Sequence, residues 1–169
     1  MGRIDRGTRI DILFHYTNSV RQAVELTEGP LNILLIDDNR DHAKILQWAF
    51  RKYGRQDEFT YFEDGANALE YLKKVTQERK AVPDLIFLDL NLPRLDGREV
   101  LRLLKEEETT KAIPVVIVSS SEREEDVRKA YELGASSYVS KSAILNDMDP
   151  MVKSMQASWS KATRLPNKI

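Results

Sequence analysis

The feature that most constrains the fold is the repeated alternation of short apolar runs with segments whose apolar residues recur at helical spacing. The runs have the length of buried strands and cover residues 31–36, 59–62, 84–88, 114–118 and 136–139. Such alternation is typical of a parallel sheet, because parallel strands need crossover connections, and these are right-handed. The sequence therefore predicts an α/β fold: a flavodoxin-like (βα)5 doubly wound parallel sheet with strand order 2-1-3-4-5.

Local signals mark where some of the helices begin and end. Ser121 and Glu124 match a capping box at the start of the fourth helix, and Gly134 follows its last residue. Asp149 followed by Pro150 is typical of an N-cap before proline at the first helical position. A last helix is therefore expected after residue 150.

Composition limits the classes of function. The 169 residues, 41% of them hydrophobic, suffice for one domain with a real core. A formal net charge of -1 gives no general attraction to nucleic acid or to anionic membranes, and the absence of cysteine excludes disulfides, thiolate zinc sites and redox thiols. No apolar stretch approaches the ~20 residues that span a bilayer, and the first residues lack the apolar region of a secretion signal. We expect a soluble, cytoplasmic protein.

Acidic residues end two of the apolar runs: Asp37 and Asp38 follow the first, and Asp89 follows the third. In the predicted strand order these two strands are neighbours, so their carboxylates would converge at one edge of the sheet. At ~4 Å and an effective dielectric near 20, each like-charge pair costs on the order of 4 kcal/mol, which a proton or a cation must relieve. An oxygen-only ligand set with no nearby histidine or cysteine favours Mg²⁺, or Mn²⁺, over zinc.

Polar residues also end the fourth and fifth strands, where Ser119 and Lys141 can reach the same edge. A hydroxyl, an ammonium and a metal around one carboxylate suit a phosphoryl group, whose oxygens accept hydrogen bonds and charge from all three. Asp89 would be the nucleophile that forms an acyl phosphate.

Taken together and in this order, these residues resemble the receiver domains of two-component response regulators. The resemblance covers about residues 31–160 and is carried by Leu34–Asn39, Asp84–Pro93, Asp96–Gly97, Ser119, Gly134–Ala135, Tyr138 and Lys141. Within that family the chain is similar to the small stand-alone receivers that serve phytochrome-type histidine kinases. That narrower likeness rests on residues 77–82, 89–100 and 130–135 and on Ser158–Trp159.

The resemblance implies that Asp89 accepts a phosphoryl group from the phosphohistidine of a sensor histidine kinase. It further implies that Asp37, Asp38 and Asp89 hold Mg²⁺, and that the backbone carbonyl of Asn91 is another ligand. A protein of this kind is a phosphoacceptor that assists its own phosphorylation and dephosphorylation, and is not an enzyme in the usual sense.

The resemblance also assigns switch roles. Ser119 would reorient toward the phosphoryl group, Tyr138 would turn inward behind it, and Lys141 would pair with a phosphate oxygen, a shift between two pre-existing states. One residue departs from the family pattern: Ser142 follows Lys141 where receivers usually carry a proline whose bond is commonly cis. A non-proline cis bond costs ~3 kcal/mol, so we expect a trans bond or a strained one.

Three segments are expected: an N-terminal extension over residues 1–30, a receiver domain over 31–160 and a C-terminal tail over 161–169. The extension carries a partly apolar stripe that fits either a short amphipathic helix or a disordered segment. With no output domain expected, the signal would leave through protein contacts, either a homodimer or an unidentified downstream protein.

Other interpretations remain open. Asp37 and Asp38 alone could cap a helix, and His15 and His42 lack ligand partners at recognisable spacing, so both histidines are left outside the site. A phosphohydrolase of the haloacid dehalogenase type would need an aspartate where Asn91 stands. A flavodoxin-like cofactor binder would need a phosphate-cradling loop after the first strand, where the acids would repel phosphate. A receiver-like adaptor that is never phosphorylated is the third alternative.

Overall fold

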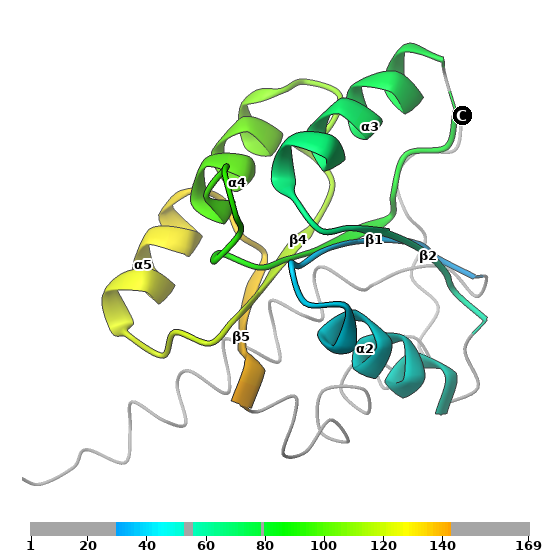
Figure 1. Cartoon of the computed structure of the whole chain (residues 1–169). Helices are drawn as coiled ribbons and strands as arrows, with labels where there is room; N and C mark the ends of the chain where they lie inside the picture. Colours follow the sequence, from blue (N-terminus) through cyan, green and yellow to red (C-terminus); the bar gives the residue numbers. More distant parts are fainter. Residues whose placement is uncertain (1–29, 53–55, 79, 143–169) are drawn as a thin grey trace, which may run out of the picture.

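The computed structural model describes residues 30–52, 56–78 and 80–142, and these form a five-stranded parallel sheet with the order β2-β1-β3-β4-β5 (Figure 1). The strands are β1 (Asn32–Ile36), β2 (Glu58–Phe62), β3 (Leu85–Leu88), β4 (Val115–Ser119) and β5 (Ser137–Ser140). The predicted flavodoxin-like fold and its strand order are therefore confirmed. The expected helix after residue 150 and the two predicted terminal segments lie outside the described residues, apart from Pro30.

Helices cover both faces of the sheet. They are α2 (Arg40–Lys52), α3 (Gly65–Gln77), α4 (Gly97–Glu106) and α5 (Glu124–Glu132). Within the described chain α2 lies on one face, and α3, α4 and α5 lie on the other (Figure 1). Successive strand residues point to opposite faces, so Ile33 and Leu35 pack in the cluster under α2, whereas Leu34 and Ile36 pack in the cluster under the other three helices. The three central strands β1, β3 and β4 supply apolar residues to both clusters, as strands covered on both faces require.

Helix α5 begins differently from the sequence prediction. Its N-cap is Arg123, which makes no side-chain cap hydrogen bond, so the capping box predicted from Ser121 and Glu124 is wrong. The helix begins two residues later than predicted, so Ser121 lies in the loop before it, where its hydroxyl donates to the carboxylate of Asp126 at 2.6 Å and its oxygen accepts from the Arg123 amide at 3.4 Å. Gly134, with φ +94°, follows the end of this helix as predicted.

The register of the central strands places the strand-end acids side by side. Ile36 of β1 pairs with Leu88 of β3, and the Asp89 amide donates to the Ile36 carbonyl at 2.8 Å. Helix α4 begins close behind Asp89, and a Cβ at Gly97 would lie 2.1 Å from the Asp89 carbonyl oxygen. Glycine is therefore required there for steric reasons, and the close approach of this backbone fixes where Asp89 sits.

Candidate functional site

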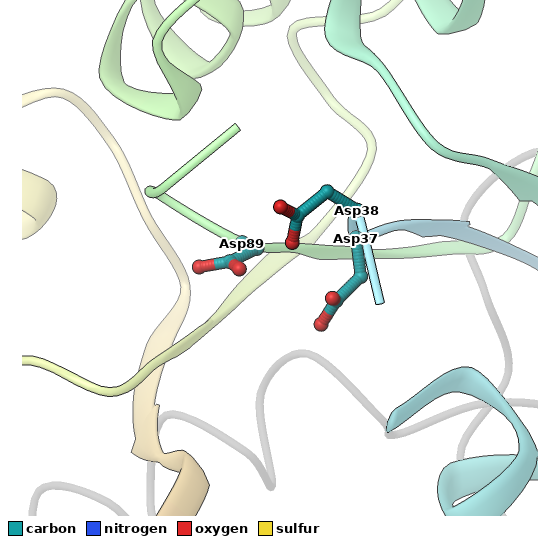
Figure 2. A group of neighbouring side chains, drawn as sticks. All are labelled: Asp37, Asp38 and Asp89. Atoms are coloured by element: carbon teal, nitrogen blue, oxygen red, sulfur yellow. The ribbon is translucent and has the colours of Figure 1, made fainter. Parts of the chain in front are cut away.

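Three carboxylates gather at the carboxyl edge of the sheet. Asp37 and Asp38 follow β1, Asp89 follows β3, and one oxygen of each lies within 4.8 Å of the others (Figure 2). Asp37 and Asp89 are buried, with 5% and 2% of their surface exposed, whereas Asp38 is exposed. The cluster predicted from the strand ends is thus present in the structure, with its open side at Asp38.

Lys141 joins two of these carboxylates from the end of β5. Its Nζ lies 2.5 Å from Asp89 Oδ2 and 3.0 Å from Asp37 Oδ2, and its side chain is buried. Burial alone would lower the pKa of Lys141, but the hydrogen bonds to Asp89 and Asp37 outweigh burial and raise that pKa above its ordinary value. The lysine is therefore charged. The bond to Ser142 is trans, since the described residues contain no cis peptide bond, so the missing proline does not prevent the lysine from reaching Asp89.

The donor set fits a hard divalent cation. Three carboxylates and one ammonium leave two negative charges uncompensated in a largely buried place, and oxygen ligands of this kind bind Mg²⁺ and Mn²⁺. The exposed side at Asp38 leaves room for the waters that Mg²⁺ retains. Asn91 lies next to the cluster, because its backbone amide donates to Asp89 Oδ1 at 3.0 Å.

His42 belongs to this site, contrary to the sequence interpretation that placed no histidine near the acids. Its Nδ1 lies 3.2 Å and 3.3 Å from the two Asp37 oxygens, and its Nε2 lies 3.4 Å from Asn39 Nδ2. These contacts fit the tautomer in which Nδ1–H donates to the carboxylate and Nε2 accepts from the amide. The signal that could have found it is its place in the first turn of the helix that follows Asp37, where a side chain leans back toward the strand end.

Ser119 and Tyr138, the two remaining predicted site residues, meet at the loop between β4 and α5. Ser119 is fully buried at the end of β4, and its Oγ accepts a hydrogen bond from the Ser121 amide at 3.2 Å. The Tyr138 hydroxyl donates to the Ser121 carbonyl at 2.8 Å, and burial raises the pKa of this phenol. Both side chains thus hold the same loop residue, Ser121.

The fold and the acid cluster at its carboxyl edge define a class of protein. The family of the response regulator receiver domain matches residues 33–153, which is well over half of the chain. The chain belongs to this family, whose members work in two-component signalling. Within the described part of the chain no helix has the length and apolar character needed to cross a membrane.

Two individual relatives align with about four fifths of this chain. The chain is 35% identical over 139 residues to the probable methanogenesis regulatory protein FilR2 of Methanothrix harundinacea, covering 82% of this chain and 90% of the relative. It is 36% identical over 138 residues to the response regulator Rcp1 of Synechocystis sp., covering 81% of this chain and 94% of the relative.

Two solved structures share this fold over nearly the same range. The crystal structure of the Mn²⁺-bound form of Rcp1 matches with a TM-score of 0.69 at 36% identity, covering 82% of this chain and 100% of that one. The structure of the phosphorylated cyanobacterial phytochrome response regulator RcpA matches with a TM-score of 0.70 at 36% identity and the same coverage.

Proposed function

We propose that this protein is the phosphoacceptor of a two-component phosphorelay and that Asp89 receives the phosphoryl group from a sensor histidine kinase. The observation that carries the proposal is the position of Lys141, whose Nζ joins Asp89 and Asp37 at 2.5 and 3.0 Å inside the acid cluster. A buried nucleophilic carboxylate with an ammonium on one oxygen and neighbouring acids able to hold a cation suits phosphoryl transfer.

In the proposed reaction one oxygen of the Asp89 carboxylate attacks the phosphorus of a phosphohistidine in line with the bond to the imidazole. The new O–P bond forms an acyl phosphate, the N–P bond breaks, and its electron pair stays on the imidazole nitrogen, which is free to take up a proton. Lys141 stabilises the added charge by moving its hydrogen bond from the carboxylate to a phosphoryl oxygen. The protein acts here as a phosphoacceptor rather than as an enzyme, and hydrolysis of the acyl phosphate ends the signal.

Asp37, Asp38 and Asp89, together with the Asn91 carbonyl, would hold Mg²⁺, with Mn²⁺ as a substitute. When bound, the ion supplies charge neutralisation for the phosphoryl oxygens. The hard oxygen donors and the excess negative charge of the cluster support this assignment, as does the Mn²⁺-bound form of Rcp1. Asp37 also accepts hydrogen bonds from the Asn39 amide and from His42, and these contacts fix the orientation of its carboxylate.

The similar proteins also support a proposal for the upstream partner of this protein. The likeness to the phosphorylated phytochrome response regulator RcpA over 82% of this chain supports a phytochrome-type histidine kinase as the upstream partner. We place the protein in the cytoplasm, with residues 31–160 as the receiver domain, and assign its output to protein contacts, either a homodimer or a downstream protein. Ser119 and Tyr138 would couple the phosphoryl group to those contacts.

The test is the intact mass of the protein after incubation with a small phosphodonor, with Mg²⁺ or with a chelator. The proposal predicts the addition of one phosphoryl group to wild type with Mg²⁺, none with chelator and none on Asp89→Asn. Asp41→Asn is the matched control, because Asp41 is an exposed acid of α2 that pairs with Lys44. Wild type that stays unmodified with both a phosphodonor and a histidine kinase would favour the phosphorylation-independent adaptor.

A further inference from the structure

A buried carboxylate outside the acid cluster lies in the first turn of α5. Asp126 is 6% exposed and accepts three hydrogen bonds from side chains. Arg98 of α4 donates to its Oδ1 at 2.7 Å, whereas the Ser121 hydroxyl at 2.6 Å and Arg123 Nε at 3.1 Å donate to its Oδ2. Asp126 therefore ties α4 and α5 to the loop between β4 and α5.

Ser121 connects this network to the phosphorylation site. Its hydroxyl binds Asp126, its carbonyl accepts from the Tyr138 hydroxyl at 2.8 Å, and its amide donates to Ser119 Oγ at 3.2 Å. Ser121 therefore makes three hydrogen bonds, and one of them holds the Ser119 hydroxyl, which the proposed function couples to the phosphoryl group. The series of hydrogen bonds that begins at Asp126 therefore reaches the Ser119 hydroxyl.

We propose that Arg98 and Asp126 are positioning residues that, through Ser121, keep the Ser119 hydroxyl on the loop and so restrain phosphorylation of Asp89. This inference rests on the proposed function and adds a restraint on the rate of that reaction. When the Ser119 side chain rotates so that its hydroxyl donates to a phosphoryl oxygen, Oγ moves away from the Ser121 amide, which must then move with its loop to find another acceptor. That movement pulls the Ser121 hydroxyl away from a buried charged acceptor, so the network stabilises the unphosphorylated arrangement.

The charge of the network is consistent with this role. Hydrogen bonds from Ser121 and Arg98 lower the pKa of Asp126 to about 2, so its carboxylate is ionised at neutral pH and holds its donors strongly. Arg98 also pairs with Asp96, the N-cap of α4, at 3.2 Å, and α4 begins close behind Asp89. The hydrogen bonds and ion pairs of the network therefore connect Asp96 at the start of α4 with Ser119 at the end of β4.

The test compares initial phosphorylation rates with a small phosphodonor at saturating Mg²⁺, followed by intact mass. Ser121→Ala removes the contact to Asp126 while Arg98 and Arg123 still pair with the buried carboxylate, and Arg98→Gln weakens the same network from α4. Both variants should be phosphorylated about tenfold faster than wild type or more, since one hydrogen bond to a charged group no longer opposes the movement. Their Mg²⁺ affinity, measured by calorimetry, should be unchanged.

Arg102→Gln is the matched control, because Arg102 lies one turn further along α4 and pairs with Glu99 and Glu106 on the surface. It should react at the wild-type rate. If Ser121→Ala and Arg98→Gln react no faster than Arg102→Gln, the network has a purely structural role and the proposal is overturned. If wild type itself is not phosphorylated, the proposed function fails, and this inference fails with it.

Discussion

Replacement of Lys141 by methionine should make the stability of the protein depend on a divalent cation. The variant keeps most of the side-chain stem but removes the ammonium that joins Asp89 and Asp37. Oxygens of the three acids lie within 4.8 Å, where each like-charge pair costs roughly 3 to 4 kcal/mol at an effective dielectric of about 20. Removing one partner of a buried ion pair costs ~3–5 kcal/mol. We therefore expect the free energy of unfolding in chelator to fall by about 3 kcal/mol.

Saturating Mg²⁺ should reduce that loss relative to wild type by about 1.4 kcal/mol, roughly half of it, because the ion supplies the positive charge that the lysine provided and stabilises the folded variant more than wild type. The Mg²⁺ affinity of the variant should rise about tenfold, since the ammonium no longer competes for the Asp37 and Asp89 oxygens. Urea unfolding in chelator and in Mg²⁺ measures the first effect, and titration calorimetry measures the second.

Lys105→Met is the matched control for this experiment. Lys105 is also a partly buried lysine, but its Nζ donates to the carbonyls of Lys111 and Ile113 rather than to carboxylates. Its replacement should cost the same stability with and without Mg²⁺. If Lys141→Met loses the same free energy of unfolding with and without Mg²⁺ and its Mg²⁺ affinity is unchanged, the lysine does not compete electrostatically with the ion and the prediction is refuted.

Three further perturbations test other parts of the structure. His42→Ala should weaken Mg²⁺ binding about tenfold in calorimetry, because Asp37 loses the donor that orients its carboxylate. His42→Gln should retain part of the affinity. A His42→Ala variant that binds Mg²⁺ as tightly as wild type would contradict this role of His42. The pKa of Asp126 is about 2 in the fold and near 3.8 when unfolded, so its stabilising contribution is complete above about pH 4 and is lost as the pH falls through about 2. The difference in urea midpoint between wild type and Asp126→Asn should accordingly shrink over that range, and a constant difference would argue against the pairing. Gly97→Ala should lower the free energy of unfolding by about 2 kcal/mol or more and slow phosphorylation, since its Cβ would clash with the Asp89 carbonyl oxygen. Wild-type stability and a wild-type phosphorylation rate would show that the backbone at Asp89 moves to accommodate the added methyl group.

The sheet could be predicted from the sequence because its signals are local and repeated. Each strand is a short apolar run, each is followed by helical spacing, and a parallel sheet of such units has few acceptable orders. The acid cluster followed from the same reasoning, since the ends of β1 and β3 must meet once those strands are neighbours. Lys141 could be placed at the same edge for the same reason. The roles assigned to these side chains stay predictions.

The sequence prediction was wrong at two other residues, Ser121 and His42. Ser121 has the spacing of a capping residue, but its hydroxyl binds Asp126, whose acceptor strength comes from burial beside Arg98 of another helix. His42 approaches Asp37 only because the turn after β1 and the start of α2 bring the ring back over the strand end. The Ser121 error therefore arose where a contact between helices overrides a local capping signal, whereas the His42 contact is local and could have been inferred from its place in the first turn after Asp37.

The most direct test of the account is to locate the phosphoryl group by reductive trapping. Borohydride converts an aspartyl phosphate to homoserine, which peptide mass spectrometry assigns to one position. After incubation with a phosphodonor and Mg²⁺, we expect homoserine at Asp89 and unmodified Asp37 and Asp38. Homoserine at either of the β1 acids, or none anywhere in protein whose mass shows a bound phosphoryl group, would contradict the assignment of Asp89 as the acceptor.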